Sequence, residues 1–367
     1  MKIKTLLQVI NQHVPFETAE SWDNVGLLIG DESAEISGVL TALDCTNEIV
    51  DEAINQGFNT IICHHPLIFK GVKNIIHQDG YGAILRKLIK NDMNLIALHT
   101  NLDVYPKGVN AMLAEKLQLK NQQILNPEIL KYYKVQVFIP EANLKSFKDA
   151  LSDAGLAEEG NYKYCFFESS GNGQFKPTGS ANPHIGSIDK IEEVKEFKLE
   201  FMIETYQKDL AEELIKNNHP YETPVFDFIK MEKEANYGLG IIGDLESEMD
   251  ISTFVKHVKA NLAMPSVRYV GNLDQIIKKV AIIGGSGIGF ETQAAQQGAD
   301  IFITGDIKHH EALDAKTAGI NLLDINHYSE YVMKDGLCNL LIDWFNPDDI
   351  TFEIKASNLN TDPFNYL

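Results

Sequence analysis

Two adjacent histidines, His64 and His65, follow the apolar run Ile61-Ile62-Cys63 and precede Pro66. Imidazole is the commonest metal ligand among side chains. An apolar run stopped by proline is typical of a buried strand whose last side chains emerge at a sheet edge. Because adjacent residues of an extended segment point to opposite sides, the two histidines would bind different ions, or one would orient the other's site. Taken alone, the motif is equally compatible with two hydrogen-bonded histidines and no metal.

Two further pairs of possible metal ligands follow short apolar segments. His99 comes directly after one such segment, with Asp103 four residues further on, and His327 and Glu330 follow another. His327 and Glu330 are three residues apart at the predicted start of a helix, so they project from the same face. Helical metal sites use this arrangement of a histidine and a carboxylate. The three groups together favour a metal centre more strongly than any one of them does.

The elements that position these groups form strand-helix-strand units. Strands are predicted over 38–43 and 60–63, with a helix over 47–56 between them, so the two strands should be parallel with a right-handed crossover. We expect the three groups to end strands of the same parallel system and therefore to converge at one sheet edge. Imidazole and carboxylate without thiolate suit zinc, iron or manganese, and a bridging carboxylate suits two ions. Two ions about 3.5–4 Å apart favour hydrolysis.

The charge and the cysteine pattern exclude several classes of protein. The chain has 367 residues, with 32 Lys plus Arg against 52 Asp plus Glu and a formal net charge of −20. The electrostatic field of this negative charge repels polyanions, which argues against nucleic acid or an anionic membrane as the main partner. No signal peptide and no membrane-spanning apolar stretch is found, so we expect a soluble cytoplasmic protein. The cysteines are scattered and expected to be reduced thiols: Cys45, Cys63, Cys165 and Cys338.

The middle of the chain has a different order of predicted strands and helices. Strand, helix, strand, strand, helix and strand are predicted in that order, which is the order of a ferredoxin-like domain. The predicted ranges are 132–140, 143–154, 162–168, 193–206, 208–217 and 225–229, with an exposed loop over 171–186. His184 and His219 lie in or beside its turns and are expected to be structural. We therefore predict an α/β protein: a layered α/β body made of two related halves, 1–125 and 236–367, with a ferredoxin-like (βαββαβ) domain inserted over 126–235.

A glycine-rich loop, Gly284 to Gly289, separates a predicted strand from a predicted helix. Dinucleotide cofactors bind loops of this kind, but the G-x-G-x-x-G spacing is absent. We expect these glycines to allow a tight turn and a close approach to the metal pocket. Asp23 and Asn24, in the polar segment after Trp22, are expected to form a turn rather than to bind a metal.

Several motifs together resemble one family, the NIF-three-like dinuclear metal centre proteins, often labelled GTP cyclohydrolase type 2 homologues. The motifs occur in order in both outer segments: Ser21-Trp22-Asp23-Asn24-Val25-Gly26, Ile62-Cys63-His64-His65-Pro66, His99-Thr100-Asn101-Leu102-Asp103, Thr304-Gly305-Asp306-Ile307-Lys308-His309-His310 and His327-Tyr328-Ser329-Glu330. The inserted segment, with Gly160-Asn161-Tyr162 and His219-Pro220-Tyr221-Glu222-Thr223-Pro224, looks like the PII/CutA-type domain of longer bacterial members.

The resemblance implies a set of functional residues and an assembly. Two divalent ions per subunit, zinc first with iron or manganese as alternatives, would be held by His64, His65, Asp103, His327 and Glu330, with Glu330 as the bridge. The pocket or the layer behind the ligands would contain His99, Asp306, His309 and His310. Many members space the last His and Glu by four residues, whereas here the gap is three. The resemblance also implies a toroidal homohexamer whose sites face an internal cavity that holds a small molecule.

Two functions remain open at this point. The first is a metal-dependent hydrolase acting on a nucleotide-like or other small anionic molecule, with GTP ring opening suggested by the family label. The second is a metal-binding regulatory or metal-handling assembly without turnover, because a ligand set does not name a substrate and the inserted domain resembles sensors. No catalytic residue is assigned. The remaining histidines, His13, His77 and His257, are expected at the surface.

Overall fold

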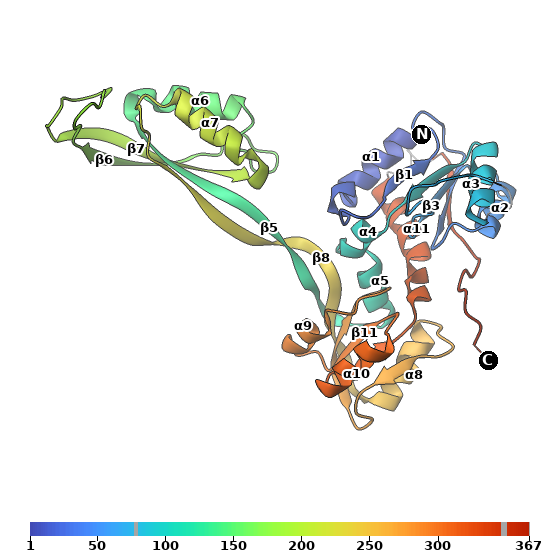
Figure 1. Cartoon of the computed structure of the whole chain (residues 1–367). Helices are drawn as coiled ribbons and strands as arrows, with labels where there is room; N and C mark the ends of the chain where they lie inside the picture. Colours follow the sequence, from blue (N-terminus) through green and yellow to red (C-terminus); the bar gives the residue numbers. More distant parts are fainter. Residues whose placement is uncertain (77–79, 346–350, 367) are drawn as a thin grey trace. The chain divides into compact units, whose positions relative to one another are not determined.

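The computed structural model describes residues 1–76, 80–345 and 351–366, so the prediction for His77 lies outside the described residues. The chain divides into two compact units, one formed by residues 1–128 with 236–367 and the other by residues 129–235 (Figure 1). It enters the second unit within β5 (Lys120–Pro140) and leaves within β8 (Phe226–Asp250). All four cysteines are free. Among the described helices, none combines the length and apolar character needed to cross a membrane.

The N-terminal part of the first unit contains a five-stranded sheet with the order β1-β4-β3-β2-β13. Its strands are β1 (Gly26–Ile29), β2 (Gly38–Ala42), β3 (Thr60–Cys63), β4 (Asn94–Ala97) and β13 (Glu353–Ala356). The predicted strand-helix-strand unit is confirmed, because β2 and β3 are parallel and α2 (Asn47–Asn55) connects them. The Thr46 hydroxyl accepts a hydrogen bond from the backbone N–H of Ile49 and caps α2.

Besides α2, the described residues of this part form four α-helices and one short 3₁₀ helix. They are α1 (Ile3–His13), α3 (Gly80–Lys90), α4 (Thr100–Val104) and α5 (Val109–Lys116), with a short 3₁₀ helix over Phe16–Thr18. The apolar spacing of α1 buries Ile3, Leu6 and Ile10 on one face. β4 is parallel to β3, whereas the edge strand β1 is antiparallel to β4.

The C-terminal part of the first unit has its own sheet segment, in the order β8-β10-β11-β12-β9. Its further strands are β9 (Arg268–Val270), β10 (Ile276–Ile282), β11 (Ile301–Thr304) and β12 (Leu322–Asp324). Its helices are α8 (Ile251–Asn261), α9 (Glu291–Gln296), α10 (His309–Thr317), the 3₁₀ helix His327–Val332 and α11 (Met333–Trp344). β10, β11 and β12 are parallel to one another, whereas β8 and β9 pair antiparallel at the two sides.

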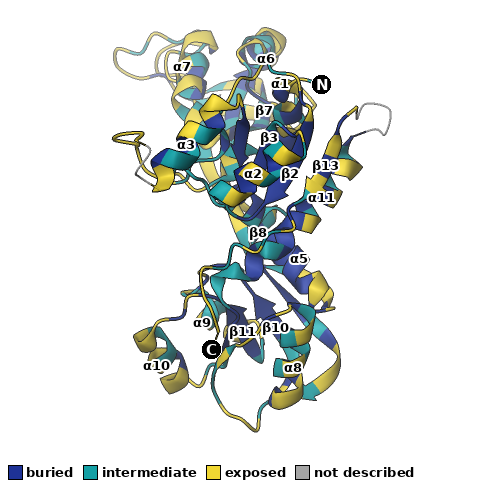
Figure 2. Cartoon of the chain, turned by 90° about the vertical axis from the view of Figure 1, so that its right-hand side faces the viewer, coloured by how far each residue is buried: buried dark blue, intermediate teal, exposed yellow. Residues whose placement is uncertain are grey.

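The expectation of one parallel system for all three ligand groups is wrong. β3 and β4 belong to the five-stranded sheet, whereas β12 belongs to the other sheet. A single hydrophobic core joins the two parts, with α5 and α11 residues such as Leu113 and Leu337 packed among side chains of both sheets. Figure 2 shows the buried strands of each sheet beside helices with exposed outer faces. This core, rather than strand pairing, holds the two sets of strand ends together.

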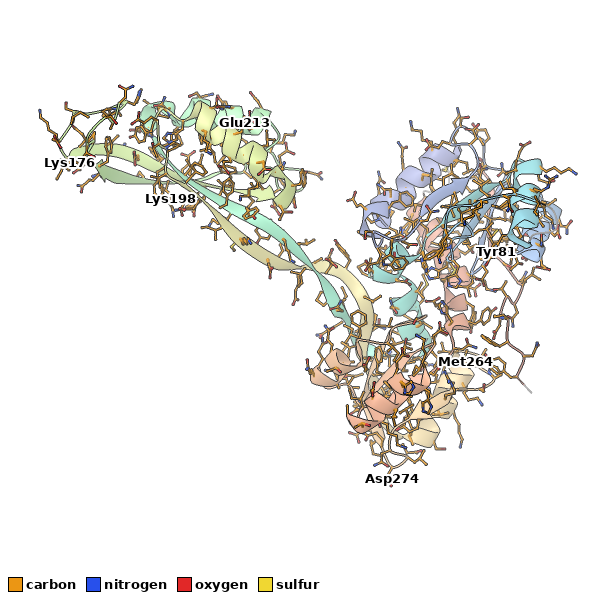
Figure 3. All side chains as sticks on the ribbon, in the orientation of Figure 1. Tyr81, Lys176, Lys198, Glu213, Met264 and Asp274 are labelled. Atoms are coloured by element: carbon orange, nitrogen blue, oxygen red, sulfur yellow. The ribbon has the colours of Figure 1, made fainter. Side chains whose placement is uncertain are left out.

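The second unit consists of parts of β5 and β8, the strands β6 (Phe167–Phe175) and β7 (Glu192–Glu204), and the helices α6 (Leu144–Asp153) and α7 (Lys208–Asn218). Its strand order is β6-β7-β5-β8, and β7 pairs antiparallel with both β5 and β6. The unit has its own apolar core, which includes Phe147, Phe201 and Ile215. Figure 3 shows the side chains of both units.

The predicted strand 162–168 and loop 171–186 need correction. β6 begins at Phe167 and continues to Phe175, so it includes glycine-rich residues that were expected to form a loop. Tyr164 has a φ of +63°, which interrupts the predicted strand. The physical reason for the shift is cross-strand pairing: regular backbone pairing with the long strand β7, including Gly173 with Val194, outweighs the low strand propensity of the segment.

Candidate metal centre

The candidate centre is built from the ends of strands. His64 and His65 come directly after β3, and His99 and Asp103 lie at and within α4, just beyond β4. The remaining two residues, His327 and Glu330, lie in the 3₁₀ helix that follows β12. A 3₁₀ helix has three residues per turn, so residues three apart are in line on one side. This explains how a spacing of three directs both side chains to the same place.

Three groups of side chains could each hold a metal ion, because their possible ligand atoms lie within 4.8 Å of one another. Their members are His64, Asp103 and Glu330; His65, His327 and Glu330; and His64, His65 and His99. Glu330 belongs to two groups, as a bridging carboxylate would. The third group brings His99 among the possible ligands, whereas the sequence placed it in the surrounding pocket.

Each of the four histidines has its Nδ1 directed at an oxygen atom that fixes the ring. The pairs are His64 with the Leu98 carbonyl at 2.8 Å, His65 with Asp44 at 2.7 Å, His99 with Asp23 at 2.9 Å and His327 with Asp306 at 2.7 Å. Because a carbonyl can only accept, the Nδ1 of His64 carries the proton and its Nε2 presents a lone pair. Such partners behind histidine ligands are usual at metal sites.

The Nε2 atoms of three histidines converge on the Glu330 carboxylate. Its Oε2 lies 3.1 Å from His65, 3.3 Å from His327 and 3.7 Å from His64. The Nε2 of His64 is fully buried and has no hydrogen-bond partner among the described residues, although Asp103 Oδ1 lies at 3.5 Å. A buried lone pair beside two carboxylates is unfavourable unless a proton or a cation lies between them. The residues therefore fit a divalent metal ion.

The electrostatics of the group also favour a cation. Burial opposes protonation of His65, but Asp44 and Glu330 outweigh this effect and raise the pKa of His65 to about 10. The hydrogen bond with Glu330 raises the pKa of His327 to about 9. Burial acts to raise the pKa of Glu330, but His327 and His64 hold it well below its usual range. The carboxylate is thus ionised, and the raised pKa values of the two histidines indicate that the surrounding carboxylates stabilise positive charge at this place.

The glycine loop packs against Glu330. Gly285 has a φ of +59°, and a Cβ added there would lie 2.4 Å from Glu330 Oε1. The backbone N–H of Gly284 donates to Asn110 Oδ1 at 2.8 Å, which fixes the loop to α5. The expected tight turn and close approach to the pocket are confirmed.

The other predicted residues lie in different surroundings. Asp306 contacts His327, as described above, whereas His309 and His310 are exposed at the start of α10 and belong to none of the three groups. His13 is exposed and stacks on Trp344, with ring centroids 4.6 Å apart. His257 is half-buried and contacts the Leu117 carbonyl.

Sequence reasoning missed the carboxylates behind two histidines. Asp23 was expected to form a turn, and it does accept the Asn24 N–H, but it also fixes His99. Asp44 was not singled out, although it is the second residue after β2, just as His65 is the second residue after β3. The strand-end argument that found the histidines would have found Asp44 as well.

A cavity of about 580 Å³ adjoins the centre within the first unit. His65 and His327 form part of its wall, and the start of α2 forms another part through Thr46 and Asn47. The size suits a small organic molecule. A ligand in this cavity would contact two of the histidines directly.

We expect Asp44→Ala to weaken metal binding by about 10–100-fold, because the His65 ring loses the carboxylate that orients it and raises its basicity. Isothermal titration with zinc measures the effect. Asp314→Ala, which removes an exposed carboxylate on α10, is the matched control and should bind zinc like the wild type. Equal zinc affinity in the Asp44 variant would contradict the role given to this contact.

The fold and the site define an α/β protein with a histidine-carboxylate cluster suited to metal ions. The model of the family described as Duf34/NIF3 (NGG1p interacting factor 3) matches residues 1–363. The chain belongs to this family, and the resemblance seen in its motifs is confirmed.

Relatives and solved structures agree with this assignment. Two relatives named GTP cyclohydrolase 1 type 2 homolog are each 62% identical to this chain. One is from Staphylococcus aureus (strain COL) and aligns over 367 residues, and the other is from Staphylococcus epidermidis (strain ATCC 12228 / FDA PCI 1200) and aligns over 366 residues. In both cases 100% of each chain is covered. The crystal structure of Staphylococcus aureus protein SA1388 is similar at 58% identity and a TM-score of 0.85, covering 100% of this chain and 99% of that one. A Bacillus cereus protein related to NIF3 matches at 38% identity and a TM-score of 0.73, with the same coverage.

Proposed function

We propose that the protein is a metal-dependent hydrolase with a two-ion centre that acts on a nucleotide-like or other small anionic substrate. One ion would be held by His64, Asp103 and Glu330, and the other by His65, His327 and Glu330. The observation that carries the proposal is the position of Glu330, whose carboxylate belongs to both groups. Zinc is the first candidate, because imidazole and carboxylate ligands suit it, with iron or manganese as alternatives.

The chain's own residues would bind the ions and shape the substrate site. Asp44, Asp306 and the Leu98 carbonyl keep three histidines in the tautomer whose Nε2 faces the ions. When bound, a pair of such ions polarises a substrate oxygen and lowers the pKa of water. The cavity beside His65 and His327 would hold the substrate, and backbone N–H groups at the start of α2 would attract an anionic group there.

GTP is the first substrate to test, because the relatives are named GTP cyclohydrolase 1 type 2 homolog. We expect the metal-loaded protein to turn over GTP or a member of a hydrolase substrate panel. His65→Ala should lower the rate about 100-fold or more, since it removes a ligand of one ion. His13→Ala, at an exposed histidine far along the chain from every ligand, is the control and should keep full activity.

The outcomes of this assay separate the two functions. Equal rates in the wild type and in the His65 variant would contradict the proposal that the protein is a metal-dependent hydrolase. Metal bound by the wild type without turnover of any substrate would favour the non-catalytic regulatory or metal-handling alternative.

The remaining parts of the proposal concern architecture and assembly. The element order β5-α6-β6-β7-α7-β8 and the strand order of the second unit support its assignment as an inserted ferredoxin-like domain of the PII/CutA type. We also propose a cytoplasmic toroidal homohexamer whose metal sites face an internal cavity, as the motif resemblance implies. Sedimentation equilibrium of the metal-loaded protein tests the hexamer.

A further inference from the structure

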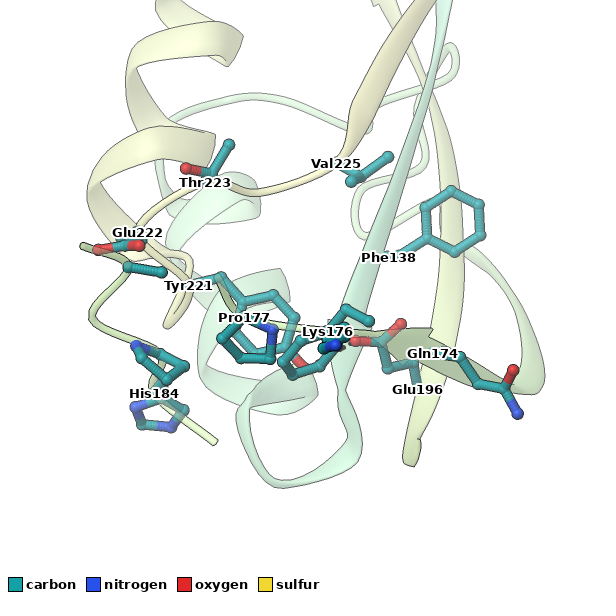
Figure 4. A pocket seen from close by; sticks show the side chains of 14 residues that line it. Phe138, Gln174, Lys176, Pro177, His184, Glu196, Tyr221, Glu222, Thr223 and Val225 are labelled. Carbon is teal, nitrogen blue, oxygen red and sulfur yellow. Dashed lines mark hydrogen bonds between the residues drawn. The ribbon is translucent and has the colours of Figure 1, made fainter. Parts of the chain in front are cut away.

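A second pocket, of about 330 Å³, lies entirely within the second unit (Figure 4). It is formed by the end of β6, the loop after it, and the segment between α7 and β8. Its lining is mostly apolar and aromatic: Phe138, Phe175, Pro177, Pro183, Tyr221 and Val225. Pockets of about 300–1,000 Å³ bind small organic molecules. The volume therefore suits a ligand of one or two rings.

One buried carboxylate lines this apolar pocket. Glu196 on β7 is only 9% exposed, and its side chain lies among the pocket residues in Figure 4. Among the described residues, Tyr221 alone donates a hydrogen bond to it, from its hydroxyl to Oε1 at 2.7 Å, and no cationic side chain pairs with it. An ionised carboxylate offers about four acceptor positions, so most of them remain free. Burial of such a group is unfavourable unless a ligand supplies donors.

The surrounding backbone is arranged to leave this carboxylate room. A Cβ added at Gly173 would lie 2.1 Å from Glu196 Oε2, so only glycine fits there without displacing the carboxylate. His219 holds Tyr221 in place: its Nδ1 accepts the Tyr221 backbone N–H at 3.1 Å, and its Nε2 donates to the Phe138 carbonyl at 2.7 Å. Burial and the contact with Glu196 raise the pKa of Tyr221, so its hydroxyl remains a donor at neutral pH.

The aromatic rings offer surfaces for a flat ligand. The ring centroids of Phe175 and Tyr221 are 5.8 Å apart with a 60° angle between the planes, and His184 lies 6.5 Å from Tyr221. Figure 4 shows His184 at one end of the pocket and Phe138 at the other. Flat rings pack against such surfaces, and a positive charge on the ligand adds a cation–π attraction.

A metal ion and an anion are poorer candidates. Glu196 belongs to none of the groups of described residues that could hold a metal. Lys176, the lysine of the lining, is exposed and lies 3.8 Å from Asp189, whereas Glu196 is buried, so the buried charge of the pocket is negative. The ligand should therefore present hydrogen-bond donors or a positive charge.

We propose that this pocket binds a small planar molecule with an amidine edge, that is, two neighbouring N–H donors on one side of a flat group. Glu196 accepts both donors, and Phe175 and Tyr221 contact the ring. A fork of two parallel N–H bonds to a carboxylate gives both strength and orientation. Aromatic amidinium cations and guanine-type bases share this edge, and the site is independent of the metal centre.

Calorimetric titration of the full chain with benzamidine and with guanosine tests the proposal. Adenosine is the ligand control, because its edge has one donor and one acceptor. Glu196→Gln keeps the shape and can still accept from Tyr221, but it loses the charge, and we expect about tenfold weaker binding. Glu213→Gln, on the exposed side of α7, is the matched variant and should bind like the wild type (Figure 3).

The results separate the ligand sources. Binding of benzamidine but not guanosine indicates that the site takes aromatic amidinium cations. Binding of guanosine indicates that it takes neutral guanine-type bases. Absence of binding for both probes, equal binding of adenosine, or equal affinity in the Glu196 variant would overturn the proposal. If that variant does not fold, hydrogen exchange of the wild type decides. Protection by the bound probe should be confined to the segments that line the pocket, which are the residues around Phe138 and Glu196 together with 173–184 and 219–225. Protection elsewhere would also overturn the proposal.

Discussion

Glu330→Gln is expected to remove both metal ions from the protein. The carboxylate belongs to two of the groups that could hold a metal, so one substitution damages both. The amide keeps the size of the side chain but removes its negative charge, and it directs an N–H₂ group toward imidazole nitrogens at 3.1–3.7 Å. Removal of a residue that only hydrogen-bonds to a metal ligand typically weakens metal binding by about 10–100-fold, and we expect a larger loss of affinity here because Glu330 itself is a proposed ligand.

Metal analysis of purified protein, followed by zinc titration of the chelator-treated protein, measures this effect. Glu115→Gln, at an exposed position of α5, is the matched control and should retain wild-type metal content. If Glu330→Gln loses only one ion, Glu330 is a ligand of that ion alone and not a bridge between two ions. Full wild-type metal content would contradict the proposed centre.

Gly285→Ala is expected to weaken metal binding by more than about tenfold and to destabilise the fold by about 2–3 kcal/mol. The new methyl group would lie 2.4 Å from Glu330 Oε1 and 3.1 Å from its Cδ, so the carboxylate must move. Glu330 is only 3% exposed and is surrounded by histidines, so it has little space in which to do so. The φ of +59° adds the cost of a left-handed backbone for alanine.

Gly298→Ala separates these two effects. Gly298 also has a positive φ, of +85°, but a Cβ there meets no atom within 4 Å. This control should lose about 1 kcal/mol of stability and keep its metal affinity. Chemical denaturation and zinc titration of both variants provide the comparison. If both variants bind zinc equally well, the glycine loop does not shape the site.

Much of the local structure is predictable from the sequence. The segment ending in His64 and His65 is a buried strand, and the helix over 47–55 lies where Thr46 and Gly57 limit it. These features depend on residues close together in the chain, such as an apolar run, a capping hydroxyl or a glycine. In contrast, α8, β9 and the length of β8 were not predicted, because the patterns of these segments are weaker.

The candidate site shows the same division. Residue types and strand ends indicated three groups of possible ligands, which included His99. The family resemblance narrowed the ligand set to His64, His65, Asp103, His327 and Glu330, and the structure brings these five together. Asp23 and Asp44 could not be assigned as partners of His99 and His65, because a hydrogen bond between side chains depends on the final positions of both. The shift of β6 toward the glycine-rich segment likewise depends on its partner β7.

What the sequence determined by itself was therefore the α/β class, the family and the side chains capable of binding a metal, since all of these are encoded in short stretches. Only the tertiary structure decided that the ligands come from two sheets rather than one and that His65 meets Glu330, 265 positions away in the chain. The physical reason is that periodicity and capping act over a few residues, whereas the approach of distant side chains is set by the shared hydrophobic core around α5 and α11.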